Sequence, residues 1–281
     1  MFESIIAWFI KILGLRKPAT PPKTLFFHVK HDAEAGFNTK GSLQQIYNLI
    51  RANNKTGVPV GFHPQCAGDW ATQLEYFAEC QNIPTMLPVL CPSTHGTGEP
   101  YKLSTDQLNQ ALEVCKIECF NMQEAVSYYR DVFGQPFPTD YAKSIFAFAK
   151  SLGKYVFWSE WDWRAFPVIA QTIKGYEDTV VVSLGTNANY IEPAQGFDKY
   201  LRQFKRRGAS IQSWYWWERH GRVSGTEAEM PPELMIQHTR EALTAGCEVI
   251  QYEPFWYFFN NTVPRQQLIS MLSASFTSKP G

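Results

Sequence analysis

Three glutamates stand where short apolar runs end, among aromatic and amide side chains. They are Glu124 in Phe120-Asn-Met-Gln-Glu124, Glu218 in Trp214-Tyr-Trp-Trp-Glu218 and Glu253 in Gln251-Tyr-Glu-Pro254. Hydrolysis of a glycosidic bond needs one carboxylic acid that protonates the leaving oxygen and a second carboxylate that activates water or attacks the sugar. Apolar surroundings raise the pKa of a carboxyl group and so favour an acid. The three glutamates therefore predict acid–base chemistry on a sugar linkage.

Further polar and aromatic residues at the predicted strand ends are candidates for substrate binding. Aromatic residues make up 15% of the chain, including nine Trp, and such rings suit the apolar faces of sugars, although each single ring can equally belong to the core. The substrate-binding candidates are His28, His63, Asn121, Trp158, Glu160, Asp162, Trp214, Trp216 and Trp256.

Two other interpretations of these residues stay open. The glutamates could be ion-pair partners of the cations Lys30, Arg130, Arg164 and Arg219 in a barrel without activity. A metal site could instead use His28, Asp32 and His63, but the fifth and sixth predicted strands contain no histidine, so we expect no metal and no cofactor. No G-x-S-x-G motif supports a serine nucleophile.

These side chains need elements that bring them together, and the chain alternates β-rich runs with amphipathic helices. The predicted strands are Leu25–Lys30, Val58–His63, Thr85–Leu90, Ile117–Asn121, Tyr155–Ser159, Val180–Leu184, Ile211–Trp216 and Glu248–Tyr252. The predicted helices begin near Ser42, Trp70, Ser104, Thr139, Phe166, Gly196, Pro231 and Pro264.

Eight such units predict an α/β fold of the (β/α)8 TIM-barrel class, with an open doubly wound sheet as the alternative. Neither G-x-G-x-x-G after the first strand nor G-x-x-x-x-G-K-[ST] occurs, so no nucleotide site is indicated. In such a barrel the active site lies at the carboxyl ends of the strands, which is where the candidate residues stand.

The barrel is predicted to span residues 24–281 as a single domain. Residues 1–16 are apolar but interrupted by Lys11, and they predict a short helix that contacts a membrane surface or caps the barrel floor. Residues 17–23 contain three prolines and predict an extended linker. A secreted or surface-attached protein is slightly favoured over a cytoplasmic one, and the oligomeric state is left open.

Composition restricts the partners. Lys and Arg total 26 residues, and so do Asp and Glu, so the chain has no net charge that would favour binding to nucleic acid. We expect an oligo- or polysaccharide substrate instead. The six cysteines show no C-x-x-C pairing, which argues against a zinc site and leaves their redox state open.

Several segments of the chain resemble the catalytic barrel of glycoside hydrolase family 98, endo-acting enzymes that cut β-linked galactose or xylose polymers with inversion. The similar segments are Phe26-Phe-His-Val29, Ile117-Glu-Cys-Phe-Asn-Met-Gln-Glu-Ala125, Gly153-Lys-Tyr-Val-Phe-Trp-Ser159, Ser213-Trp-Tyr-Trp-Trp-Glu-Arg-His-Gly221 and Pro232 through Pro254. The resemblance implies Glu124 as the general acid, Glu218 as part of the base and Glu253 as the glutamate that ends the last strand.

Two features depart from that family. Its seventh strand tends to present Asp where this chain has Glu218, and the β-rich domain that usually follows the barrel is not seen before residue 281. The substrate is therefore not carried over. The sequence predicts an inverting endo-glycosidase, with a non-catalytic carbohydrate-binding barrel and an amidohydrolase-like metal enzyme as the alternatives.

Overall fold

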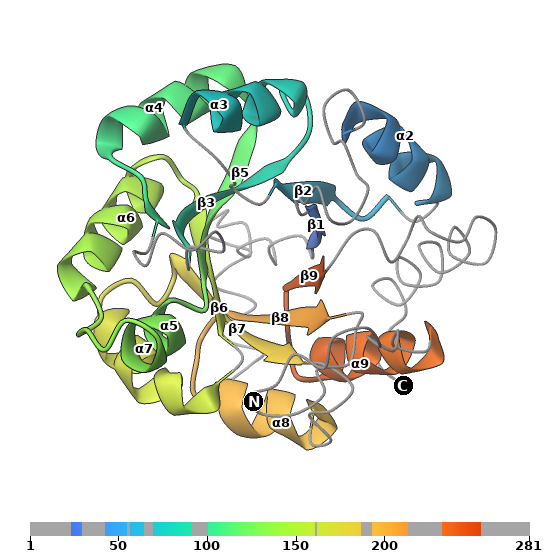
Figure 1. The fold of residues 1–281 in the computed structure, drawn as a ribbon. Helices are drawn as coiled ribbons and strands as arrows, with labels where there is room; N and C mark the ends of the chain where they lie inside the picture. Colours follow the sequence, from blue (N-terminus) through green and yellow to red (C-terminus); the bar gives the residue numbers. More distant parts are fainter. Residues whose placement is uncertain are drawn as a thin grey trace, which may run out of the picture.

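The computed structural model describes residues 24–29, 43–54, 57–64, 70–91, 101–160, 162–186, 193–212 and 232–253. Within them, eight parallel strands close into a barrel, which confirms the predicted fold class (Figure 1). The order around the barrel is β2-β1-β9-β8-β7-β6-β5-β3, and pairing of β2 with β3 closes the ring. The strands are β1 (Thr24–Val29), β2 (Val60–Pro64), β3 (Thr85–Cys91), β5 (Ile117–Gln123), β6 (Tyr155–Glu160), β7 (Val180–Thr186), β8 (Arg207–Gln212) and β9 (Val249–Glu253).

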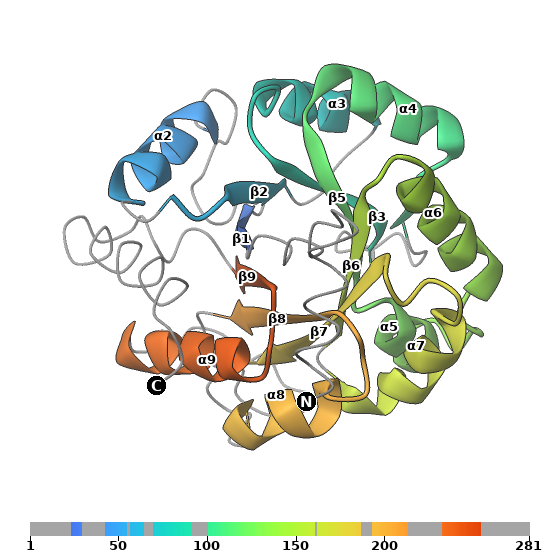
Figure 2. The ribbon, with the colours of Figure 1, turned by 180° about the vertical axis from the view of Figure 1, so that it is seen from behind.

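Helices surround the strands, as both views of the ribbon show (Figures 1 and 2). The α4 helix begins where the sequence predicts, because Ser104 and Gln107 form a reciprocal capping box. The helices are α2 (Leu43–Asn53), α3 (Trp70–Glu79), α4 (Thr105–Val114), α5 (Ala125–Asp131), α6 (Thr139–Ser151), α7 (Phe166–Thr172), α8 (Pro193–Leu201) and α9 (Pro232–Thr244), with a 3-10 turn η2 (Trp163–Ala165) before α7.

The part of the barrel interior nearer the amino ends of the strands is apolar. Its side chains form one buried cluster that consists of Phe26, Met86, Cys119, Phe157, Val181 and Val249, with Tyr155 packed against it. Two strand glycines make room for the largest rings: a Cβ at Gly61 would lie 2.7 Å from the Phe26 ring, and one at Gly208 would lie 2.6 Å from the Phe157 ring. Large and small residues thus alternate around the interior, as close packing of a barrel requires.

The seventh barrel strand differs from the prediction. It runs from Arg207 to Gln212, whereas the sequence suggested Ile211–Trp216. The run Arg207-Gly-Ala-Ser lacks large β-forming side chains, but Gly208 is needed beside Phe157, and the Arg207 guanidinium donates to the carbonyls of Phe204 and Ala245. The aromatic run of residues 214–217, which the prediction included, lies outside the described residues.

Other predicted features fall on residues that the structure does not describe. These are the helix of residues 1–16, the linker of residues 17–23, residues 213–231 with Trp214, Trp216 and Glu218, and residues 254–281 with Trp256 and the last helix. No described helix is long and apolar enough to cross a membrane.

Besides the 3-10 turn η2, two described elements were not predicted. A short strand, β4 (Tyr101–Lys102), pairs antiparallel with the end of β3, and the helix α5 follows β5 before α6 begins. The α5 helix bears directly on the site, because Glu124 immediately precedes it.

The five described cysteines (Cys80, Cys91, Cys115, Cys119 and Cys247) are buried free thiols. Burial raises the pKa of the Cys80 thiol to about 12 and raises that of Cys115 still further. Thiols in this state are poor nucleophiles and poor metal ligands, so the described cysteines serve as small apolar core residues.

Candidate active site at the carboxyl ends of the strands

Beyond the apolar cluster, toward the carboxyl ends of the strands, the barrel interior becomes polar. Side chains alternate between the two faces of a strand, so positions two residues beyond Cys119, Val181 and Val249 also face inward. Those positions hold a set of buried polar residues from alternate strands, which form one layer of the interior as in other barrels of this class. The layer consists of His63, Asn121, Ser183 and Gln251, each 0% exposed.

His63 is the centre of this layer. Its Nε2 lies 3.0 Å from Asn121 Nδ2 and its Nδ1 lies 3.1 Å from Gln251 Nε2. A neutral imidazole accepts at one nitrogen and donates at the other, so one of the two amides has to present its oxygen to the ring. Asn121 Oδ1 is buried without a hydrogen-bond partner in the described part of the chain. If the Asn121 amide is turned over, this oxygen accepts a hydrogen bond from the ring N–H of His63.

A second polar contact in the interior joins two serines from the other set of alternate strands. Ser159 Oγ of β6 lies 2.8 Å from Ser210 Oγ of β8, past the intervening strand β7. Ser183 Oγ is buried without a hydrogen-bond partner among the described residues. Because buried polar groups are normally hydrogen-bonded, this layer has capacity left for a water molecule or a hydroxyl group.

Glu124 lies at the carboxyl end of β5 in a strained backbone conformation. Its φ of 51° and ψ of 24° are left-handed, and Glu124 is the one non-glycine residue with positive φ in the described part of the chain. Its N–H donates to the Ser159 carbonyl at 2.6 Å, and its side chain makes no capping bond to α5. Such strain persists only where the surrounding structure imposes it, and it is common at active sites.

Glu160 lies at the end of the neighbouring strand β6 and is completely buried. Its carboxylate accepts from Val126 N at 2.7 Å and Ser127 Oγ at 2.6 Å. Burial raises the pKa of Glu160 to about 8; the bonds from Ser127 and Val126 oppose that rise, and the nearby Glu124 adds to it. The prediction that Glu160 binds substrate is therefore replaced, because this side chain contacts the start of α5 and points away from the barrel interior.

Asp162 belongs to an ion-pair cluster. It pairs with Arg130 and with Arg164, and Arg130 also bonds Asp131. Although partial burial opposes it, the hydrogen bonds from Arg164 and Arg130 lower the pKa of Asp162. Asp162 is a substrate-binding candidate from the sequence, and the contacts that the structure gives its carboxylate are with these two arginines.

Trp158 is wrong as a candidate sugar platform. The indole is 0% exposed and packs outward between the rings of Phe137 and Phe146, at 5.1 and 5.8 Å between centroids. Its strand neighbours Phe157 and Ser159 face the interior, so alternation turns Trp158 toward the helices. Trp163, another ring that the sequence offers as a sugar platform, is 50% exposed and is stacked on Tyr200 at 5.2 Å between ring centroids.

The order of the strands around the barrel relates the candidate catalytic glutamates to one another. Three strands separate β5 from β9 in either direction, so Glu124 and Glu253 end strands on opposite sides of the barrel. Glu218 follows β8, the neighbour of β9, but lies outside the described residues. The structure therefore describes the backbone of two of the three glutamates, and the side chain of Glu124 alone.

Four interior residues were missing from the candidates: Ser159, Ser183, Ser210 and Gln251. Their signal was a change along each strand, from an apolar or glycine position to a polar one two residues later. His28 follows Phe26 by the same spacing, although its side chain lies outside the description.

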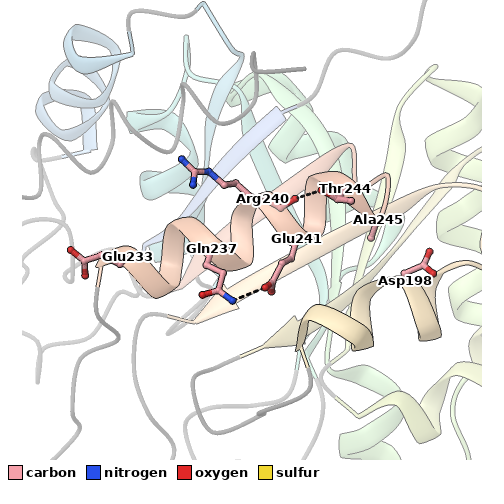
Figure 3. A pocket seen from close by; sticks show the side chains of 7 residues that line it. All are labelled: Asp198, Glu233, Gln237, Arg240, Glu241, Thr244 and Ala245. Atoms are coloured by element: carbon pink, nitrogen blue, oxygen red, sulfur yellow. Dashed lines mark hydrogen bonds between the residues drawn. The ribbon is translucent and has the colours of Figure 1, made fainter. Parts of the chain in front are cut away.

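A separate cavity of about 670 Å³ lies between α8 and α9 (Figure 3). It is lined by one face of α9, including Glu233, Gln237 and Glu241, together with Asp198 of α8. These side chains come from helices and not from strand ends, so the cavity is distinct from the candidate site. Within the described residues, no group of three His, Cys, Asp or Glu side chains could hold a metal ion.

No family model and no curated protein matches the chain. Solved structures match its fold. An archaeal fructose 1,6-bisphosphate aldolase shares 11% identity and a TM-score of 0.55 over 91% of this chain and 95% of the other. A dihydropteroate synthase from Coxiella burnetii, in complex with pteroic acid, shares 10% identity and a TM-score of 0.52 over 93% and 96%.

A truncated 3-deoxy-D-arabino-heptulosonate 7-phosphate synthase from Thermotoga maritima shares 10% identity and a TM-score of 0.46 over 90% of this chain and 84% of the other. The first two similarities establish the fold of the chain. At such identities they do not transfer chemistry, because one barrel fold serves many reactions.

Proposed function

We propose that this protein is a glycoside hydrolase that cuts a β-linked glycan, with Glu124 as the general acid. The observation that carries the proposal is the left-handed conformation of Glu124 at the carboxyl end of β5. Holding a non-glycine residue there costs about 1–2 kcal/mol, a cost that a purely structural position would avoid with glycine.

The polar layer of the barrel interior supports a neutral, hydroxyl-bearing substrate. The described members of that layer are amides, hydroxyls and an imidazole, with no carboxylate, ammonium or guanidinium group among them. Amides and hydroxyls can both donate to and accept from sugar hydroxyl groups. A phosphorylated substrate would instead favour cationic side chains.

The second carboxylate of the proposed mechanism comes from the β8–β9 side of the barrel. Glu253 ends β9, which lies opposite β5, and Glu218 comes after β8 in the sequence, so the proposal takes one of these two as the base. In an inverting mechanism, the acid and the base would lie roughly 6.5–9.5 Å apart, with the attacking water between the base and the sugar.

Hydrolysis of β-galactans, xylans and mucin-type glycans by the purified protein tests the proposal. Wild type is compared with Glu124→Gln and with Glu113→Gln, a control that removes an exposed carboxylate from α4. We expect turnover with an inverted anomeric product, seen by NMR, that falls at least about 100-fold in Glu124→Gln and is unchanged in the control.

The other outcomes separate the alternatives. Saturable glycan binding without turnover would replace the enzyme with a non-catalytic carbohydrate-binding barrel. Turnover that chelators abolish and a divalent metal restores would favour a metal-dependent hydrolase. A retained anomer would keep the hydrolase and overturn inversion.

A further inference from the structure

The turn that carries Glu124 is held from strand β6 by two consecutive residues. Ser159 accepts from Glu124 N through its carbonyl oxygen, and Glu160 accepts from Val126 N and Ser127 Oγ through its carboxylate. Val126 is the second residue of α5, and the N–H groups of a first helical turn have no partner within the helix. The carboxyl group of Glu160 therefore supplies the bond that this N–H would otherwise lack.

We propose that Glu160 is a positioning residue, which fixes the left-handed turn at Glu124 from the adjacent strand by holding Val126 and Ser127, the second and third residues after Glu124. It does not act on substrate directly, because its side chain is directed at α5 and not into the barrel interior, which the preceding residue Ser159 faces. The inference extends the proposed function, since it assigns the support of the proposed acid to a residue that the acid–base scheme does not use.

The surroundings of Glu160 explain why a carboxyl group suits this position. One oxygen receives the Val126 N–H and, at 3.4 Å, the Trp158 Nε1–H, while the other meets the Ser127 hydroxyl. Glu124 is the charged group that influences Glu160 most. The charges of Arg130, Asp131 and Asp162 are paired with one another in the ion-pair cluster around the far end of α5.

Two substitutions at one position separate support of the turn from mere bulk. In Glu160→Gln, the amide oxygen can still accept from Val126 N and the amide nitrogen can donate to Ser127 Oγ. In Glu160→Met, a side chain of similar length remains, but the strong acceptor is lost. Ser127→Ala removes the second bond and leaves the first.

The first measurement is hydrogen exchange of the Val126 amide, which needs no substrate. We expect exchange about 10- to 100-fold faster in Glu160→Met, and near the wild-type rate in Glu160→Gln. The control amide is Tyr128 N, which bonds the Glu124 carbonyl inside the helix at 3.0 Å; amides of α6 report on the barrel as a whole.

The second measurement is turnover of the glycan identified by the hydrolysis panel. We expect kcat to fall about 100-fold in Glu160→Met with KM within about twofold, and the Gln variant to recover most of that loss. Faster exchange throughout α6 and the barrel would mean that Glu160 only supports the fold, and a rise in KM with unchanged kcat would mean that it contacts substrate. Either result would overturn the inference.

Failure of the proposed function gives a different pattern. If wild type cleaves no glycan, but the Val126 amide still exchanges fastest in Glu160→Met and near the wild-type rate in Glu160→Gln, then Glu160 holds the turn and the assigned chemistry is wrong. If wild type cleaves a glycan but Val126 exchange is the same in all three proteins, the hydrolase stands and the role of Glu160 is rejected.

Discussion

The strained turn at Glu124 allows stability and activity to be separated with two variants, Glu124→Gly and Glu124→Ala. Both remove the carboxyl group and everything beyond Cβ, so they lose the same side-chain contacts. They differ in one methyl group, which at φ 51° lies close to the following carbonyl oxygen. A comparison of the two therefore isolates the cost of the left-handed backbone.

The magnitude follows from two opposing contributions. Relief of the left-handed strain favours the glycine variant by about 1–2 kcal/mol, and the greater freedom of glycine in the unfolded chain disfavours it by about 0.4–1 kcal/mol. We expect Glu124→Gly to be more stable than Glu124→Ala by about 0.5–1 kcal/mol. For a chain of this size, the gain corresponds to a rise in Tm of about 1–4 °C.

The assay is urea unfolding and thermal unfolding of both variants beside wild type, with turnover measured on the same preparations. We expect neither variant to retain hydrolysis, so the more stable protein would be an inactive one, as expected where strain is kept for function. A glycine variant no more stable than the alanine variant would refute the assignment of strain to Glu124.

Three further predictions concern the buried groups. The folded pKa of Glu160 is about 8 against an ordinary 4.5, so its contribution to stability is complete below pH 4.5 and is lost as the pH rises through 8. Between these pH values the free energy of unfolding, measured by urea titration, should therefore fall less in Glu160→Gln than in wild type. Gly61→Ala should prevent folding or cost at least about 1–3 kcal/mol by circular dichroism, because its Cβ would lie 2.3 Å from the Pro84 carbonyl oxygen. Cys119 and Cys247 should react with a thiol reagent only after unfolding, as checked by mass spectrometry of native and denatured samples; rapid native labelling of either would contradict their burial.

Much of the fold could be predicted because strands buried on both faces have a simple sequence pattern. Seven of the eight strands lie within a few residues of their predicted positions, and Ser104-Thr-Asp-Gln identified the start of α4. The seventh strand could not be found in this way, since Gly208 is required by the Phe157 ring from a strand two places away. A local pattern contains no information on such a contact.

The assignment of roles within the site shows the same division. Residue type and strand-end position identified Glu124, His63 and Asn121 as a possible group, and the structure brings His63 and Asn121 within 3.0 Å of each other. The same criteria assigned Glu160 to substrate binding and could not show that it holds the start of α5. That role depends on α5, a helix that the sequence pattern does not predict.

The sequence by itself determined that the chain forms a barrel of alternating strands and helices, and that polar side chains gather at the carboxyl ends of its strands. Periodicity and strand order are local or repeated along the chain, so they can be deduced without coordinates. Only the tertiary structure decided that Trp158 faces the helices, that Gln251 completes the polar layer around His63, and that Glu160 holds the turn at Glu124. Each of these depends on contacts between residues that are separated along the chain, which no local pattern contains.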